Sequence, residues 1–187
     1  MTVIVYLHGF NSSPESGKAR AMSEWMASLG RADDWWCPQL ANNPAQAMAE
    51  VEAGLARRAP MNLTLVGSSL GGFYATYLAE KLGCKAVLVN PAVRAHELLR
   101  EALGPQANWH TNEQWELTEA HLAELAAQHV ATLTRPERYL LLAQTGDEVL
   151  DYRDAVAHYA GSRQIVEDGG DHGFVGFERH FQTILDF

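Results

Sequence analysis

The stretch Asn62–Phe73, NLTLVGSSLGGF, decides the fold. It begins with residues typical of a buried strand and continues into residues that open a helix. Between the two lies Gly-x-Ser-x-Gly, with Ser69 at its centre and Gly67 and Gly71 on either side. A strand that turns sharply into a helix strains its central residue, and side chains two positions away would collide. The pattern therefore predicts that Ser69 is a nucleophile exposed at a strand-to-helix turn.

The neighbouring serine does not meet this requirement. Ser68 has Val66 and Leu70 at the positions where a sharp turn needs glycine. At the start of the helix, the backbone N–H of Leu70 is expected to point to where an oxyanion would form. The stretch is not a phosphate-binding loop, because it lacks the glycine and lysine spacing of either common nucleotide motif.

Strand-like and helix-like segments alternate along most of the chain. Expected strands cover residues 2–7, 35–40, 62–66, 86–89, 138–142 and 164–166. Expected helices run from Ser13-Pro14 to Leu29, from Asn43-Pro44 onward, over residues 73–82 and from about Phe177. This alternation predicts an α/β fold with a mostly parallel central sheet and helices on both faces.

Residues 93–136 interrupt the alternation. They are helix-like with no expected strand, so we predict a helical cap insert within one domain spanning residues 1–187. A long crossover helix with a broken middle is the alternative. A cap at this position would lie over Ser69, and its large apolar side chains would either line an acyl pocket or only pin the cap to the core. These side chains are Leu98, Leu99, Leu103, Trp109, Trp115 and Leu117.

A serine hydroxyl needs a base to remove its proton, and one histidine has the expected location. His172 follows the last expected strand, in the glycine-rich loop Gly-Gly-Asp-His-Gly, which can approach the serine closely. His8 precedes the serine and is not expected to be the base. The other histidines lie in expected helices or in the insert and are interpreted as surface residues: His96, His110, His121, His129, His158 and His180.

The acid that orients this base should follow an earlier strand, and three residues are candidates for this role. Asp147 lies just past the expected strand at 138–142 and is preferred. Glu148 is a rival, and Asp151 is the main competitor, although it resembles the N-cap of the next helix. Asp171 adjoins the histidine, so its side chain is expected to point elsewhere.

The residues after the first strand, His8-Gly9-Phe10, should reach the same edge of the sheet as the serine. The N–H of Phe10 is predicted to be the second oxyanion donor. His8 and Gly9 would support the loop.

Composition excludes several classes of function. The chain has 187 residues, 47% of them hydrophobic, and a net charge of -9, which argues against disorder and against nucleic-acid binding. No apolar run is long enough to span a membrane, and residues 1–7 lack the basic start of a signal peptide, so a cytoplasmic location is expected. The two cysteines have no zinc-ligand spacing, and no metal site is expected.

Together, Leu7–Phe10, Gly67–Phe73, Thr145–Glu148 and Gly170–His172 resemble the α/β-hydrolase superfamily, and within it the small YqiA-type bacterial esterases. The resemblance implies a hydrolase without a cofactor that acts on carboxylic esters or acyl thioesters as small-molecule substrates. In that scheme Ser69 is the nucleophile, Asp147 the acid and His172 the base.

Other functions stay open at this point. The same three residues could serve C–C bond hydrolysis or acyl transfer, because fold and triad do not separate these reactions. A scaffold without catalytic activity that binds a ligand or a protein is a third hypothesis. The sequence leaves a monomer and a homodimer equally open.

Overall fold

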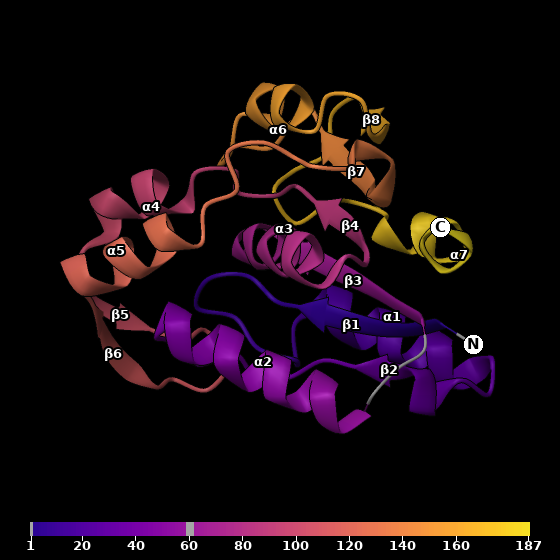
Figure 1. The fold of residues 1–187 in the computed structure, drawn as a ribbon, viewed down its shortest axis with the longest axis horizontal. Coiled ribbons are helices and arrows are strands. Elements are labelled where there is room, and N and C mark those ends of the chain that lie inside the picture. Colours follow the sequence, from indigo (N-terminus) through magenta and orange to yellow (C-terminus); the bar gives the residue numbers. More distant parts are fainter. Residues whose placement is uncertain (1, 59–61) are drawn as a thin grey trace.

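The computed structural model describes residues 2–58 and 62–187. Within them, parallel strands form a six-stranded sheet in the order β2-β1-β3-β4-β7-β8 (Figure 1). The predicted α/β architecture with a parallel sheet is confirmed. The strands are β1 (Thr2–Leu7), β2 (Trp35–Trp36), β3 (Asn62–Ser68), β4 (Lys85–Val89), β7 (Tyr139–Gln144) and β8 (Arg163–Glu167).

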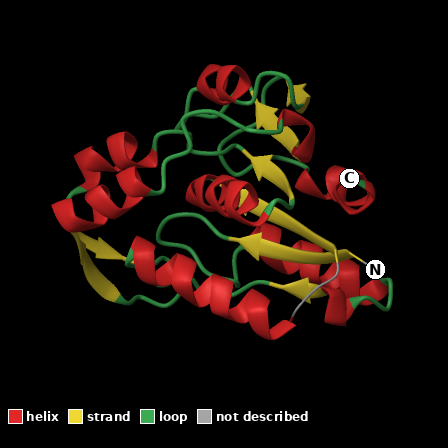
Figure 2. Ribbon diagram, viewed as in Figure 1, coloured by secondary structure: helices red, strands yellow, loops and turns green. Residues whose placement is uncertain are grey.

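Helices cover both faces of this sheet (Figure 2). Side chains of a strand alternate between its two faces, so Ile4 and Tyr6 join one apolar cluster while Val5 and Leu7 join the other. The first cluster includes residues of α1 (Gly17–Ser28), η4 (Phe177–His180) and α7 (Phe181–Asp186). The second includes residues of α2 (Pro44–Arg58), α3 (Leu70–Leu82) and α6 (Tyr152–His158).

The register of the sheet brings the strand ends that matter to one edge. Leu7 pairs with Gly67, and Ser68 pairs with Val89, which in turn pairs with Leu142. The loops that follow β1, β3, β4 and β7 therefore leave the sheet side by side. The cap elements lie at this same end of the molecule (Figure 1).

Two expected elements are shorter in the structure than the sequence suggested. The first helix begins at Gly17 instead of at Ser13, because the Ser13 hydroxyl accepts from the Glu15 N–H and closes a separate turn. The expected strand at 35–40 is limited to β2, Trp35–Trp36, at the edge of the sheet. Pro38 follows directly, and proline cannot donate to a strand ladder.

The prediction that residues 93–136 contain no strand was wrong. The cap contains α4 (Ala95–Leu98), η2 (Leu99–Ala102) and α5 (Glu119–Ala127), and η3 (Pro136–Arg138) connects it to β7. It also contains the cap hairpin, in which β5 (Gly104–Ala107) and β6 (Gln114–Leu117) pair antiparallel. Each strand has only four residues, too few for period-two alternation to be distinguished from helical periodicity. Asn112, with a φ of 57°, lies between the two strands.

The apolar side chains expected to form one wall have different environments. Leu117 is buried and Leu99 packs against the core, as expected of residues that pin the cap. Leu98, Leu103 and Trp109 are exposed, with Trp109 at 72%. None of the described helices is both long and apolar enough to cross a membrane.

Candidate active site

Ser69 occupies a strained turn between β3 and α3. Its φ of 56° and ψ of -120° lie in a region that residues other than glycine rarely adopt, which costs about 1–3 kcal/mol. The Ser69 N–H donates to the Val89 carbonyl at 3.1 Å, and its carbonyl accepts from the Ala92 N–H at 3.0 Å. A Cβ at Gly67 would collide with the Gly71 carbonyl, and one at Gly71 with the Leu7 carbonyl. Both glycines are therefore required for the turn to form.

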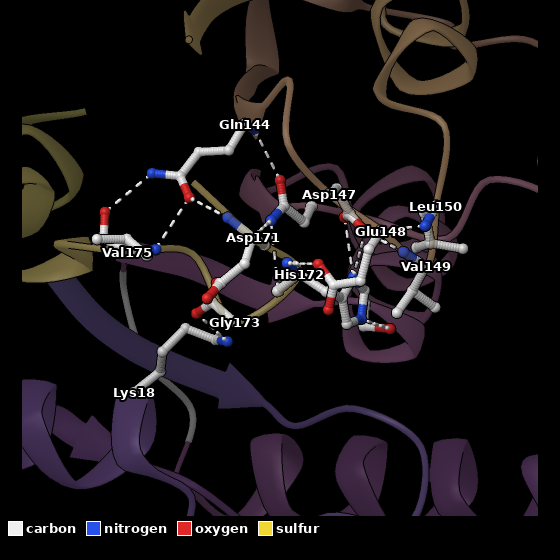
Figure 3. A network of polar contacts seen from close by, with 12 residues as sticks. Lys18, Gln144, Asp147, Glu148, Val149, Leu150, Asp171, His172, Gly173 and Val175 are labelled. Atoms are coloured by element: carbon white, nitrogen blue, oxygen red, sulfur yellow. Dashed lines mark hydrogen bonds and ion pairs between the residues drawn. The ribbon is translucent and has the colours of Figure 1, made fainter. Parts of the chain in front are cut away.

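A hydrogen-bond chain runs from Ser69 through His172 to Asp147. The Ser69 Oγ lies 3.1 Å from the His172 Nε2, and the His172 Nδ1 lies 2.8 Å and 3.0 Å from the two carboxylate oxygens of Asp147. A carboxylate only accepts, so Nδ1 carries the proton and Nε2 presents its lone pair to the serine hydroxyl. Figure 3 shows His172 and Asp147 facing each other across this contact.

The environment of Asp147 keeps its carboxylate ionised. The side chain is only 2% exposed, and burial by itself would raise its pKa. Hydrogen bonds from His172 and from the backbone N–H groups of Leu150 and Val149 outweigh burial and lower the pKa of Asp147 below its ordinary value. The two backbone donors lie at 2.8 Å and 2.9 Å. The carboxylate is thus fixed in place and charged.

The two rival acids have other partners. Glu148 accepts from the backbone N–H of His172 at 2.9 Å, so it holds the main chain of the histidine and not its ring. Asp151 caps α6 by accepting from the Arg153 N–H at 3.0 Å. His180, one of the six histidines interpreted as surface residues, is buried and pairs with Glu167 at 3.0 Å.

The loop of His172 is held by side chains that sequence reasoning missed. Buried Gln144 accepts from the N–H groups of Asp171 and Val175 and also donates to the Val175 carbonyl (Figure 3). Asn90, at a φ of 40°, donates to the Asp171 carbonyl at 2.9 Å. Gln144 is the last residue of β7 and Asn90 directly follows β4, but nothing local in the sequence identifies contacts to a loop so far along the chain.

A lysine from the opposite side of the loop completes this support. Lys18 of α1 donates to the Gly173 carbonyl at 2.8 Å (Figure 3). Burial lowers the pKa of Lys18, and the nearby carboxylates of Asp171 and Asp147 oppose that shift. The histidine loop is therefore tied to the sheet on one side and to a helix on the other.

The loop after β1 lies against the serine. A Cβ at Gly9 would be 3.4 Å from the Ser69 Cβ and 3.9 Å from its Oγ. Among the hydrogen bonds of the described residues, none uses the Phe10 N–H. Leu70 is the first residue of α3, and the first N–H groups of a helix have no partner within it. Both predicted oxyanion donors thus belong to segments that border the serine.

His8 orients this loop while staying neutral. Its Nδ1 donates to the Gly9 carbonyl at 3.0 Å, and its Nε2 accepts from the Leu40 N–H at 3.0 Å. Burial lowers the pKa of His8 to about 4, and the Gly9 carbonyl opposes the shift. Because the C=O and N–H of a planar trans peptide point in opposite directions, a fixed Gly9 carbonyl also fixes the direction of the Phe10 N–H.

A small cavity lies next to both predicted oxyanion donors. A cavity of about 30 Å³ is bordered by Phe10 and Leu70, with Leu40, Tyr74 and Trp115 as its large apolar walls. This is room for only one or two water molecules. Across residues 2–58 and 62–187, no three side chains of His, Cys, Asp or Glu are arranged to hold a metal ion.

One known family model covers nearly the whole chain. Residues 3–187 match the model of UPF0227, described as an uncharacterised protein family. The chain belongs to this family. Its resemblance to the YqiA-type α/β hydrolases, noted from the motifs, is supported by that match.

Solved structures show that this UPF0227 chain has the α/β-hydrolase fold. It resembles Est1E from Butyrivibrio proteoclasticus, solved with ferulic acid bound, at 13% identity and a TM-score of 0.74, over 100% of this chain and 88% of the other. Mouse alpha/beta hydrolase domain-containing protein 10 gives 20% identity and a TM-score of 0.74, over 98% and 88%. A monoacylglycerol lipase from Paleococcus ferrophilus gives 14% and 0.66, over 98% and 92%.

Proposed function

We propose that this protein is a serine hydrolase that cleaves carboxylic esters, or acyl thioesters, through an acyl-enzyme intermediate. The observation that carries the proposal is the continuous chain from Asp147 through His172 to Ser69 at a strained turn. A strained backbone at a serine already paired with an oriented imidazole is costly for a scaffold with only a binding role. Esterases and lipases among the solved structures of this fold lend further support.

The first half of the proposed reaction forms the acyl-enzyme. The Ser69 Oγ attacks the ester carbonyl carbon while its proton passes to the His172 Nε2. The carbonyl oxygen becomes an oxyanion that accepts hydrogen bonds from the N–H groups of Phe10 and Leu70. Asp147 stabilises the imidazolium without taking its proton. The intermediate then collapses, the C–O bond of the ester breaks, and His172 gives the proton to the leaving alcohol.

The second half releases the acid. A water molecule loses a proton to the His172 Nε2 and attacks the acyl carbon, and a second oxyanion forms at the same two donors. Collapse returns the proton to the Ser69 Oγ and frees the carboxylic acid. Every proton passes through one imidazole, so the scheme requires no metal or cofactor.

The test is turnover of p-nitrophenyl esters of increasing acyl length by the wild-type protein and by Ser69→Ala. We expect Ser69→Ala to lower kcat/KM by at least ~10³-fold with an unchanged fold, because no other group can form the acyl-enzyme. Ser68→Ala is the matched control, since Ser68 is adjacent but belongs to β3 and is buried. Retention of more than a tenth of wild-type activity by Ser69→Ala would exclude the proposal.

A further inference from the structure

Asn11, which follows the predicted oxyanion donor Phe10, is held almost entirely by the cap. Its backbone is left-handed, with a φ of 53°, and its side chain is buried. The Trp115 Nε1 donates to its Oδ1 at 2.8 Å, and its Nδ2 donates to the Gln106 Oε1 at 2.9 Å. The Trp109 backbone N–H donates to its carbonyl at 2.9 Å. Both ends of the amide and the main chain are thus bound by residues of the insert.

The side-chain partners of Asn11 belong to one hydrogen-bonded hairpin. Gln106 of β5 and Trp115 of β6 are directly paired across the cap hairpin, so one cross-strand pair binds both ends of one amide. The Trp115 ring also packs edge-on against the Phe10 ring, with centroids 5.6 Å apart and planes at 69°. The position of the hairpin is therefore transmitted to Phe10 and Asn11 together.

A second contact links the hairpin to the peptide that carries the oxyanion donor. Asn108, in the loop between β5 and β6, donates to the Ser12 carbonyl at 2.8 Å. The Ser12 N–H donates to the Gly9 carbonyl at 3.3 Å, on the same peptide whose N–H belongs to Phe10. His8 binds this carbonyl from the core side. The peptide is thus fixed from one side by the core and from the other by the cap.

We propose that Asn11 is a positioning residue through which the cap hairpin holds the Phe10 N–H in the direction that an oxyanion requires. The inference rests on the proposed function, because it assigns Phe10 a part in the transition state. A cap that only lines a substrate pocket would affect binding, and its loss would raise KM. A cap that orients an oxyanion donor affects the transition state, and its loss lowers kcat.

The experiment compares two asparagines that share a backbone conformation. Asn11→Gly keeps the left-handed backbone available and removes both side-chain hydrogen bonds. Asn112→Gly is the matched control: Asn112 has a φ of 57° in the cap hairpin and is exposed, and its hydrogen bonds among the described residues are to Asn108 and Gln114. Trp115→Phe removes the indole N–H together with part of the ring, and keeps a six-membered aromatic ring at this position. Turnover is normalised to the fraction of sites that react with a fluorophosphonate.

We expect Asn11→Gly to lower kcat by about 10–100-fold while KM changes by less than about threefold. Affinity for an alkyl boronic acid, which forms a tetrahedral adduct with the serine, should weaken by a similar factor. Trp115→Phe should lower kcat about fivefold, and adding it to Asn11→Gly should cause little further loss, because both changes break the same contact. Asn112→Gly should match wild type.

Three results would overturn the inference. The first is a folded Asn11→Gly with kcat within twofold of Asn112→Gly, and the second is a loss confined to KM. The third applies if Asn11→Gly fails to fold: it is a kcat of Trp115→Phe equal to that of the wild type. Absence of turnover in the wild-type protein is a different result, which excludes the proposed function itself. An active wild type with an unaffected Asn11→Gly excludes only the role of the cap.

Discussion

Acidification should remove stability that depends on keeping His8 neutral. This side chain is 4% exposed, and burial lowers its pKa from 6.5 to about 4. The unfolded chain, in which the imidazole is solvated, binds the proton first as the pH falls. The stability contributed by neutral His8 is therefore complete above about pH 6.5 and is lost progressively down to about pH 4.

The size of this loss of stability follows from the difference between the pKa of His8 in the folded chain and its pKa in the unfolded chain. Each unit of pKa difference corresponds to about 1.4 kcal/mol, so the change from 6.5 to about 4 gives a complete loss of about 3.5 kcal/mol. Between pH 7.5 and pH 5 the loss is about 2 kcal/mol, because folded His8 is still mostly neutral at pH 5 while the unfolded imidazole is mostly protonated. Protonation would also place an N–H on Nε2, opposite the Leu40 N–H that donates to this atom at 3.0 Å.

The assay is urea unfolding of the wild-type protein and of His8→Gln at pH 7.5 and pH 5. Glutamine does not titrate, and its amide oxygen can accept from the Leu40 N–H. The variant should be less stable than wild type at pH 7.5, and the difference should shrink by about 2 kcal/mol at pH 5. Other groups that titrate in this range affect both proteins equally and cancel. A difference that is the same at both pH values would refute the account of His8.

The remaining predictions concern the acid of the triad and the turn. Asp147→Asn should lower kcat/KM about 10⁴-fold, because the imidazole loses the carboxylate that orients it. Asp151→Asn should keep most of the activity and the stability, because asparagine can also cap α6. Equal kinetic losses in the two variants would contradict the assignment of Asp147. Gly71→Ala should unfold the protein or lower its melting temperature sharply, because its Cβ would overlap the Leu7 carbonyl. Gly17→Ala, at a site with no neighbour within 4 Å, should raise stability by about 0.5–1 kcal/mol in a thermal melt. A well-folded Gly71→Ala of wild-type stability would contradict the packing of the turn.

Local sequence predicted the turn because its geometry depends on residues close together. Glycine spacing distinguished Ser69 from Ser68, and chain order with a glycine-rich loop selected His172. The choice between Asp147 and Asp151 stayed open, since it depends on which carboxylate reaches an imidazole on another loop. The structure brings Asp147 to that ring and gives Asp151 a helix cap.

The parts that could not be predicted depend on contacts distant in sequence. Asn11 receives a hydrogen bond from Trp115, 104 residues away, and Gln144 binds the backbone of Val175, 31 residues away. The left-handed backbones of Asn11 and Asn90 are likewise set by packing, because asparagine also occurs in ordinary turns. The cap hairpin was missed because its strands are short and its hydrogen bonds to the loop after β1 join residues about 100 positions apart in the sequence.

The central claim is that Ser69 is an activated nucleophile, and covalent labelling tests it most directly. The wild-type protein is treated with a fluorophosphonate, digested, and analysed by mass spectrometry to locate the phosphonyl group. The account predicts one adduct, on Ser69, that forms in Ser68→Ala but not in Ser69→Ala, and that forms far more slowly in Asp147→Asn. No adduct on the folded wild-type protein, or an adduct on a different residue, would contradict it.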